Sequence, residues 1–372
     1  MKKKIKIALL SLVIAGGLAI PMFWSGESAL ESPVAQTAKN NANTNESSDT
    51  LITLIAVGDI MMGTNYPSPS YLPPSNVRLL EPMHAYFKKG DIVFGNLEGT
   101  VLNEGGNAKT CQDMSKCYAF RQPEYFVPQL KEAGFNFLSV ANNHMGDFGD
   151  AGRSNTQKVL KNAGIRYAGL ESCPWDTMTI KGVKVGMTAF APNNACLQIN
   201  DYATLRSVVK KLNSFCDIVI VSFHGGAEGS AKTHVTRGTE TFYGENRGNV
   251  YEFARVAIDA GADVLLGHGP HVTRALDHYK GRFITYSMGN FCTYGRFNLN
   301  GVCGMAPMFE LKLTREGKFV SGRVISTKQI GEGGPVSDPD NGAFLQLKQL
   351  TSADIPELKV NFSEDGSFNF PE

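Results

Sequence analysis

Short apolar runs alternate with amphipathic segments between Leu51 and about Gly331. Apolar runs bounded by turn residues predict buried strands, and an apolar repeat of about 3.6 residues predicts helices. We expect strands at Leu51–Val57, Asp91–Phe94, Phe135–Val140, Val183–Phe190, Asp217–Phe223, Asp263–Leu266 and Arg282–Ser287. We expect helices at Val77–Lys89, Pro123–Ala133, Asn155–Ala163, Tyr202–Asn213 and Gly248–Ala260. This alternation is typical of an α/β domain.

The pattern changes toward the C-terminus. The stretch "MFELKLTREGKFVSGRVISTKQI" alternates with period two around "REGK", which predicts a hairpin at the edge of the sheet. After Gly331 the periodicity is lost and Gly, Pro, Asp and Ser become frequent. We therefore expect a folded domain over residues 51–330 and an irregular C-terminal tail over residues 331–372.

The first 50 residues lie outside this pattern. Residues 1–24 carry four lysines and no acid, and include the apolar run Ile7–Trp24, which predicts either a signal peptide or an uncleaved membrane anchor. Residues 25–50 are rich in Asn, Ser, Thr and Ala, a composition that predicts a flexible linker. We therefore expect an extracytoplasmic protein that is membrane-anchored, secreted or periplasmic.

Charge and cysteine content narrow the possibilities further. The net charge is +1, and without the four N-terminal lysines the exported part carries −3, which argues against nucleic acid as a partner. Seven cysteines in an exported chain suggest disulfides. The candidate pairs are Cys111–Cys117, Cys292–Cys303 and Cys173–Cys196, which leaves Cys216 as a buried free thiol.

Polar side chains follow six of the expected strands. In chain order the motifs are "VGDIMMG" with Asp59, "GNLEGT" with Asn96 and Glu98, "ANNHMGD" with Asn143, His144 and Asp147, "HGGAE" with His224 and Glu228, "HGPH" with His268 and His271, and "MGNF" with Asn290. Open α/β sheets bind ligands outside the carboxyl ends of their strands. We therefore expect these loops to converge on one crevice.

The side-chain types indicate what the crevice binds. Carboxylates, imidazoles and a carboxamide without a thiolate favour divalent Mn, Fe or Zn, most simply two ions, over a structural zinc. Two such ions, roughly 3.5 to 4 Å apart, hydrolyse phosphate esters by activating a bridging water. The expected metal ligands are Asp59, Glu98, Asn143, His224, His268 and His271, and the candidate catalytic residues are His144, Asp147 and Glu228.

A simpler explanation exists for each residue alone. Asp59 follows a glycine and is a plausible turn former, "NNH" is a plausible Asx turn, and a single histidine at a strand end is commonly a solvated loop residue. Six strand ends that all carry such residues are harder to explain in this way. The set as a whole therefore favours a metal or catalytic site.

A long polar loop, "SAKTHVTRGTETFYGENRGN", separates the strand that ends at His224 from the next helix. Loops of this length in a compact domain are usually functional. The candidate substrate contacts of this loop are His234, Arg237, Glu245 and Arg247. Asn290 is a further expected contact, and Arg274 and Arg296 are further bases for an anionic chain. The sequence contains no nucleophile elbow, phosphate-binding loop, zincin helix or dinucleotide fingerprint, which excludes those enzyme classes.

The ordered motifs between Thr53 and Phe291 resemble those of the CapA/PgsA proteins of bacterial poly-γ-glutamate capsule synthesis. The domain of that family is similar to calcineurin-like metallophosphoesterases. The resemblance implies a four-layer α/β fold in which two central mixed β-sheets are flanked by helices. It also implies that Glu98 bridges two metals, that Asn143 binds metal, and that His144 protonates the leaving oxygen.

The motifs also depart from the phosphoesterase pattern. Met61 stands where a histidine is usual, Glu98 is longer than the usual aspartate, and His268 and His271 are three residues apart where many relatives have two. The "HGGAE" motif lacks the tryptophan that commonly follows its histidine in the capsule family. A site with one metal, or a binding site without turnover, therefore stays open.

The resemblance and the export segment together predict a function. We expect an exported or membrane-anchored protein of capsular poly-γ-glutamate synthesis with a hydrolase-type metal site. Its expected partners are an anionic polymer or phosphoester substrate and membrane-embedded capsule synthase subunits. The alternatives are a non-catalytic accessory subunit of a polymer synthase or exporter, and a general phosphoesterase of the cell envelope.

Overall fold

The computed structural model describes residues 51–111, 113 and 117–371. The expected signal peptide or anchor (1–24) and the linker (25–50) lie outside the described residues. In the part of the chain that is described, no helix is long and apolar enough to span a bilayer.

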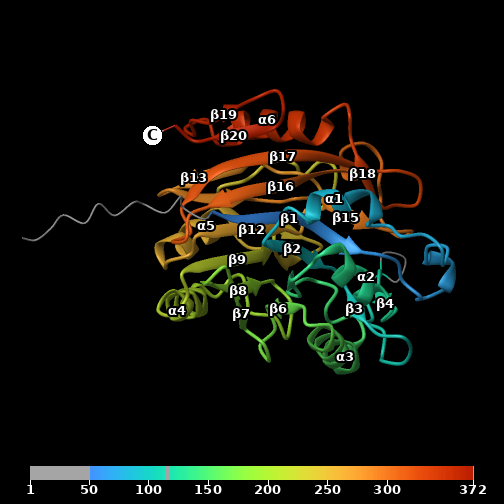
Figure 1. Ribbon diagram of the computed structural model, residues 1–372. Coiled ribbons are helices and arrows are strands. Elements are labelled where there is room, and N and C mark those ends of the chain that lie inside the picture. The colour runs from blue at the N-terminus through green and yellow to red at the C-terminus, as the bar shows by residue number, and fades with distance from the viewer. Residues whose placement is uncertain (1–50, 112, 114–116, 372) are drawn as a thin grey trace, which may run out of the picture. The chain divides into compact units, whose positions relative to one another are not determined.

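The first of two large sheets is mixed and has ten strands (Figure 1). Its strands are β1 (Ile52–Met61), β2 (Ile92–Leu97), β5 (Phe137–Ser139), β6 (Arg166–Ala168), β15 (Asn290–Thr293), β16 (Met305–Leu313), β17 (Phe319–Gln329), β18 (Pro335–Ser337), β19 (Asn361–Phe362) and β20 (Ser367–Asn369). They run in the order β19-β20-β17-β16-β1-β2-β5-β6, while β15 pairs with β1 and β18 pairs with β17. The strands β1, β2, β5 and β6 are parallel, whereas β16 is antiparallel to both β1 and β17.

The second sheet has six strands, in the order β13-β14-β12-β9-β8-β7. Their bounds are β7 Trp175–Ile180, β8 Val183–Phe190, β9 Ile218–His224, β12 Val264–His268, β13 Leu276–Tyr279 and β14 Arg282–Thr285. The four central strands are parallel to one another. Two small ladders pair β3 (Thr100–Val101) with β4 (Arg121–Gln122) and β10 (Thr241–Phe242) with β11 (Glu245–Asn246).

The helices, apart from the C-terminal one, pack on the outer faces of these sheets. They are α1 (His84–Phe87), α2 (Phe126–Ala133), α3 (Gly149–Asn162), α4 (Tyr202–Asn213), α5 (Val250–Asp259) and α6 (Gly342–Asp354), with 3-10 turns η1 (Pro69–Tyr71), η2 (Glu81–Met83) and η4 (Gly301–Gly304). Because side chains alternate along a strand, Ile55 and Val57 of β1 pack toward α1, α2 and α3, while Leu54 and Ala56 pack toward the second sheet. The strand β1 is therefore buried on both faces.

Three apolar cores define the layers. One lies between the first sheet and α1 to α3, one lies between the two sheets, and one lies between the second sheet and the helices α4 and α5. The described residues, 51–111, 113 and 117–371, lie in one compact unit around these cores. The expected fold of two mixed sheets flanked by helices is confirmed.

The expected elements agree best with the structure where the apolar pattern is uninterrupted. The strand β8 and the helix α4 have the bounds that the sequence predicts. The helix expected at Val77–Lys89 is wrong in extent, since the structure has only η2 and α1 there. Pro82 lies in the middle of that range, and a proline disfavours helical geometry in the residue before it.

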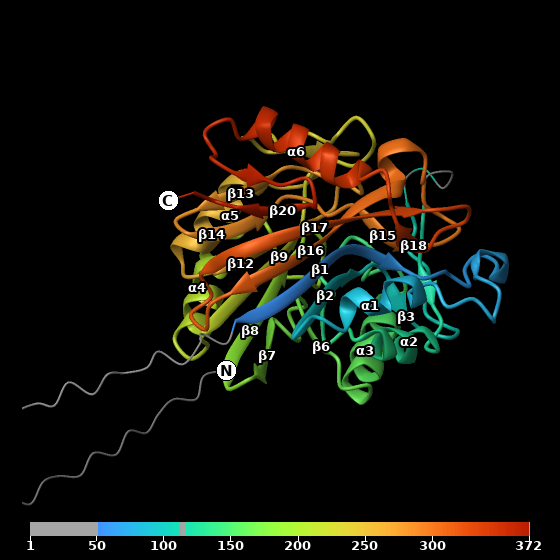
Figure 2. The same ribbon diagram turned by 45° about the horizontal axis from the view of Figure 1, so that its top comes forward.

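The C-terminal segment differs from the irregular tail that we expected. Residues 331–372 contain β18, α6, β19 and β20, and α6 lies along β16 and β17 (Figure 2). Phe344 and Leu347 of α6 are buried in the core between the sheets, together with Phe368 of β20. The hairpin of β16 and β17 is confirmed, but it lies inside the sheet because β1 and β20 pair with its outer sides.

The cysteines confirm one of the three expected pairs. Cys111 and Cys117 form a disulfide, and Cys216 is a buried free thiol as expected. The other two pairings are wrong, because Cys173, Cys196, Cys292 and Cys303 are free. The side chain of Cys292 packs in the core between the first sheet and the helices α1 to α3. The spacing of cysteines in the sequence does not show which way a side chain points.

Candidate metal centre

The functional side chains gather where strands of the two sheets end. Asp59 of β1 is in register with Asn96 of β2 and with Asn290 of β15, and His268 of β12 is in register with His224 of β9. This convergence was expected from the parallel order of the strands.

The segment between β14 and β15 joins the two sheets at this point. The amide of Met288 donates to the carbonyl of Gly267 (3.1 Å), and the amide of Asp59 donates to the carbonyl of Gly289 (2.9 Å). A Cβ at position 58 would lie 2.0 Å from the Gly289 oxygen. Gly58 is therefore needed for the approach that brings Asp59 to the junction.

Asp59, Glu98 and His271 form the centre of the cluster. Both carboxylates are fully buried, and Asn96 Nδ2 donates to Asp59 Oδ1 (2.8 Å) and to Glu98 Oε2 (2.9 Å). His271 Nδ1 lies 2.9 Å from Asp59 Oδ2, and its Nε2 lies 3.5 Å from Glu98 Oε1. One ligand atom from each of the three residues lies within 4.8 Å of the other two. Two acids and an imidazole thus face one point.

Several polar atoms around this point have no hydrogen-bond partner among the described residues. They are Glu98 Oε1, Asn143 Oδ1, both ring nitrogens of His224 and of His268, and Asn290 Oδ1, all of them buried. Leaving one such atom unsatisfied costs about 1–3 kcal/mol. Carboxylate, imidazole and carboxamide atoms are the ligands of Mn²⁺, Fe and Zn²⁺. The residues present therefore fit a divalent metal.

Electrostatics lead to the same conclusion. Burial, together with the charge of Asp59, raises the pKa of Glu98 well above its usual value. Burial opposes ionisation of Asp59, but the nearby imidazoles of His268, whose Nδ1 lies 3.3 Å from Asp59 Oδ1, and of His271 outweigh it and hold the pKa of Asp59 well below its usual range. Burial likewise opposes a charge on His271, yet Glu98 and Asp59 raise the pKa of His271 to about 10. The buried acid pair therefore favours positive charge beside it, which His271 supplies in the metal-free protein and a metal cation would supply when bound.

His271 also has a left-handed backbone, with φ of 58°. This conformation costs a non-glycine residue roughly 1 kcal/mol or more and persists where the surroundings enforce it.

Glu228 lies beside two of the candidate ligands. His271 Nε2 lies 4.0 Å from Glu228 Oε2, and Asn143 Nδ2 donates weakly to Glu228 Oε1 (3.5 Å). Glu228 therefore connects the two candidate metal ligands His271 and Asn143.

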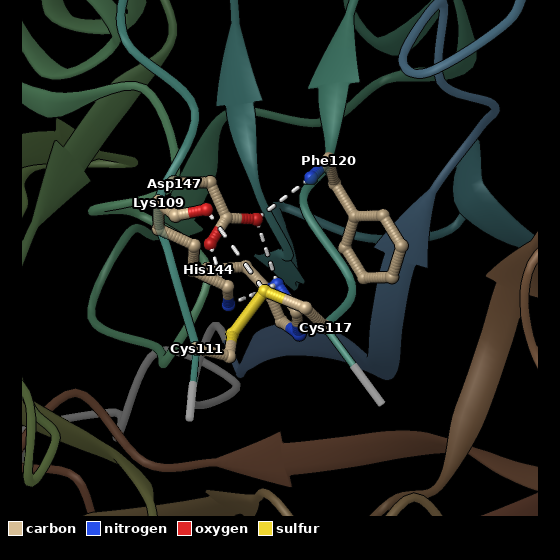
Figure 3. Close-up of a disulfide and its surroundings, with 6 residues drawn as sticks. All are labelled: Lys109, Cys111, Cys117, Phe120, His144 and Asp147. Carbon is tan, nitrogen blue, oxygen red and sulfur yellow. Dashed lines mark hydrogen bonds and ion pairs between the residues drawn. A yellow bond between two sulfur atoms is a disulfide. The ribbon is translucent and has the colours of Figure 1, made fainter. Parts of the chain in front are cut away.

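His144 and Asp147 form a second group beside the cluster (Figure 3). His144 Nδ1 lies 2.8 Å from Asp147 Oδ2, which also accepts from the Phe120 amide (2.7 Å), and Lys109 Nζ lies 2.7 Å from Asp147 Oδ1. Since the carboxylate accepts, His144 carries a proton on Nδ1. Burial and the charge of Lys109 lower the pKa of His144, which makes its imidazolium a stronger acid.

The expected substrate contacts divide into two groups. Asn290 lies in the cluster, and Arg247 is buried between Glu228 (2.9 Å) and Glu245 (2.8 Å). The guanidinium of Arg237 contacts Glu357 and lies 4.7 Å from the Tyr251 ring centre. The C-terminal segment, which we expected to be irregular, supplies this partner.

Sequence reasoning missed Asn142, Lys109 and Phe120 as parts of the site. Asn142 Nδ2 donates to Asn96 Oδ1 (3.1 Å) and to the Leu97 carbonyl (2.8 Å), and Asn142 Oδ1 accepts from the His144 amide (3.2 Å). The "NNH" doublet was a usable signal for Asn142. Lys109 and Phe120 lie on either side of a cysteine loop, and nothing in their local sequence marks them.

Comparison with known proteins decides the family. The family model described as bacterial capsule synthesis protein matches residues 53–294. The chain belongs to this bacterial capsule synthesis family. The chain is 32% identical over 261 residues to the capsule biosynthesis protein CapA of Bacillus anthracis, a match that covers 64% of this chain and 59% of that protein. It is 25% identical over 306 residues to the PGA biosynthesis protein CapA of Bacillus subtilis (strain 168), covering 78% and 73%.

The match thus spans about three fifths of the length of the B. anthracis relative. Among solved structures, a 5'-nucleotidase precursor from Thermus thermophilus aligns with a TM-score of 0.41 and 12% identity, over 84% of this chain and 61% of that chain. The NAD nucleotidase of Haemophilus influenzae aligns with a TM-score of 0.40 and 13% identity, over 81% and 56%. The assignment of the fold depends on the sheets and cores described above.

Proposed function

We propose that this protein acts in capsular poly-γ-glutamate synthesis outside the cytoplasm, as a metal-dependent hydrolase or transferase of the envelope polymer. Membership of the capsule synthesis family supports the polymer. The observation that carries the enzymatic part is the convergence of Asp59, Glu98 and His271 within 4.8 Å, surrounded by buried ligand atoms that lack partners.

The proposed metal ligands are the six residues that the sequence predicted: Asp59, Glu98, Asn143, His224, His268 and His271. When bound, divalent ions at such a site polarise a substrate oxygen and lower the pKa of a coordinated water. Glu98 is the candidate for sharing between two ions, because its two oxygens face different neighbours: Oε2 accepts from Asn96, and Oε1 makes no hydrogen bond to a described residue.

Residues of the chain itself supply the proton chemistry in this proposal. Asp147 holds one proton of His144 on Nδ1, so when the ring is an imidazolium Nε2 carries the second proton, which it donates to a leaving oxygen. The Phe120 ring lies over the imidazole, with ring centres 4.2 Å apart, and limits its rotation. Arg247 orients Glu228 beside the same cluster. His144 is therefore the proposed general acid.

Binding of an anionic chain needs a free cation, and the candidate arginines differ in this respect. Arg237, Arg247 and Arg274 each pair with a glutamate, and Arg274 is completely buried. Arg296 pairs with no carboxylate of the described residues, and its guanidinium lies 4.8 Å from the Tyr71 ring centre and 4.7 Å from that of Tyr118. Rings that hold a guanidinium by its faces leave its edge free for an oxyanion.

The residue next to Arg296 in the chain contacts the cluster. The adjacent residue, Phe297, has its ring centre 5.4 Å from that of His271 and 5.2 Å from that of Phe120. We therefore include Arg296 in the proposed function as the contact for a carboxylate or phosphate of the substrate.

One observation favours a second candidate, a non-catalytic accessory subunit that holds the polymer. Met61 is buried in β1 at the position where phosphoesterases usually supply an imidazole. Two measurements separate the candidates. Metal analysis of purified protein tests for bound Mn, Fe or Zn, and nitrophenyl phosphate hydrolysis with Mn²⁺ tests for turnover. Bound metal with hydrolysis supports the enzyme, whereas protein free of metal and inactive with every added metal supports the accessory subunit.

A cellular test complements these assays. The His144→Ala variant should lose capsule while its level and location stay those of the wild type. Full capsule in cells that carry only this variant would contradict a catalytic role for His144.

A further inference from the structure

The buried carboxylate of Asp147 is held by two residues from opposite sides of the Cys111–Cys117 loop. On one side, the Lys109 amide donates to the Asp147 carbonyl (2.8 Å) and Lys109 Nζ lies 2.7 Å from Asp147 Oδ1. On the other side, the Phe120 amide donates to Asp147 Oδ2 (2.7 Å). Lys109 Nζ also lies 3.4 Å from His144 Nδ1, so the ammonium touches both members of the His144–Asp147 pair.

The disulfide is the covalent link between these two sides (Figure 3). It joins Cys111 to Cys117 with their Cα atoms 5.6 Å apart, and Cys117 Sγ lies 3.9 Å from the Lys109 carbonyl. The described residues from Asn107 to Phe120 include no helix or strand, so no ladder of backbone hydrogen bonds fixes Lys109. Closing a loop covalently reduces the conformational freedom that its arms would otherwise have.

We propose that Lys109 is a positioning residue for His144, and that the Cys111–Cys117 disulfide holds Lys109 in place, so that the site is fully formed only in the oxidised protein. This role of Lys109 rests on the proposed function of His144 as the general acid. Asp147 has no exposed surface, so its charge needs a fixed partner. Lys109 occupies Oδ1 and leaves Oδ2 to His144 and Phe120, which fixes both the rotation of the carboxylate and the ring nitrogen that keeps the proton.

Three variants test this inference: Lys109→Met, the double variant Cys111→Ser/Cys117→Ser, and all three changes combined. Lys158→Met is the matched control, since Lys158 is exposed on α3. The first measurement needs no activity. In metal-free residues 47–372, a compact unit, ¹⁵N–¹H spectra of the imidazoles report the tautomer of His144, assigned with His144→Gln.

The wild type and the Lys158→Met control should show a single His144 tautomer with its proton on Nδ1. Lys109→Met and the double serine variant should show a mixture of tautomers. A single Nδ1–H tautomer in all of these proteins would overturn the inference. Thermal unfolding of each variant shows whether it is folded, which separates a local change of tautomer from a loss of folding. A folded variant whose tautomer is unchanged contradicts the inference.

The second measurement is nitrophenyl phosphate hydrolysis. Lys109→Met should lower kcat by roughly 10- to 100-fold with KM little changed, as expected when a group that orients a catalytic residue is lost. The combined variant should be no slower than Lys109→Met, since the disulfide acts through Lys109. If the two losses multiply instead, the disulfide does not act through Lys109 and the inference fails.

Reduction gives an independent check. Dithiothreitol, which becomes oxidised as the cystine becomes two thiols, should lower kcat of the wild type to that of the double serine variant, and that variant should not respond. The remaining cysteines are free thiols and offer no other disulfide among the described residues. An unchanged kcat in wild-type protein whose disulfide has been shown to be reduced would refute the inference. If the wild type hydrolyses no substrate, the proposed function fails, and the tautomer measurement alone decides this inference.

Discussion

Replacing Glu98 by Gln should have opposite effects on stability with and without metal. In the metal-free protein, burial and Asp59 raise the pKa of Glu98, so its contribution to stability is full below the unfolded pKa, near 4.3. That contribution is lost as the pH rises toward the folded pKa. At pH 7.5 the ionisable Glu98 therefore lowers the free energy of unfolding of the wild type relative to that of a variant with an uncharged glutamine.

The distance between the acids sets the size of this effect. Ligand oxygens of Asp59 and Glu98 lie within 4.8 Å of each other. Two unit charges at that separation repel by about 3 kcal/mol at an effective dielectric constant of about 20. For a domain of this size 1 kcal/mol corresponds to about 2 °C in Tm. The His271 cation beside both acids offsets part of this repulsion. Metal-free Glu98→Gln should therefore melt above the metal-free wild type, by up to roughly 6 °C.

Metal should reverse the order. At a Mn²⁺ concentration of about 100 times Kd, binding stabilises the wild type by about 2.7 kcal/mol. Glu98→Gln has lost a ligand and should gain little. The assay is thermal unfolding at pH 7.5 in a chelator and in Mn²⁺, with Glu132→Gln on the exposed face of α2 as a control that should follow the wild type. A Glu98→Gln protein that is less stable than the wild type in chelator, or that is stabilised equally by Mn²⁺, would refute this reasoning.

The same contacts give four more predictions. His144→Ala should lower kcat for nitrophenyl phosphate by roughly 10²- to 10⁴-fold, with metal content unchanged in elemental analysis. Burial holds the pKa of His224 well below its usual value, so the unfolded chain takes up an extra proton as the pH falls below about 6.5. The contribution of His224 to stability should therefore fall from pH 7.5 to 5.5, so urea unfolding of metal-free protein should show His224→Asn gaining stability relative to the wild type over that range. Arg296→Gln should raise KM for a γ-linked glutamate oligomer with kcat unchanged, whereas Arg206→Gln on α4 should not. Phe344→Ala should lower the free energy of unfolding by about 3–5 kcal/mol in urea, because its ring fills the core between the sheets.

The strand ends explain how much of the site could be predicted. Asp59, Glu98 and His224 each follow an uninterrupted apolar run, and parallel neighbours in a sheet bring such ends together. Because the strands are parallel, the residues that follow the apolar runs lie at the same edge of a sheet. The order of the motifs along the chain was therefore enough to predict this part of the site. The apolar pattern alone did not indicate that two sheets share the site, although the family resemblance implied two sheets. This feature depends on the segment from Met288 to Asn290, which crosses between them.

The contacts that the sequence missed involve long-range packing of irregular segments. Lys109 reaches Asp147 from a loop without periodicity, and its partner could not be inferred from spacing. Arg237 was expected to contact substrate because it lies in a long polar loop, and its contact with Glu357 could not be inferred because the segment around Glu357 was expected to be irregular. The C-terminal segment is ordered because its apolar residues, such as Phe344 and Leu347, pack into a core formed by strands that lie far away in the sequence.

The central claim is that six side chains from the two sheets bind divalent metal at one place. Anomalous diffraction from a crystal of residues 47–372 soaked in Mn²⁺ tests it most directly. We predict anomalous density enclosed by Asp59, Glu98, Asn143, His224, His268 and His271. Density elsewhere, or none at this cluster while the six side chains keep their positions, would contradict the account.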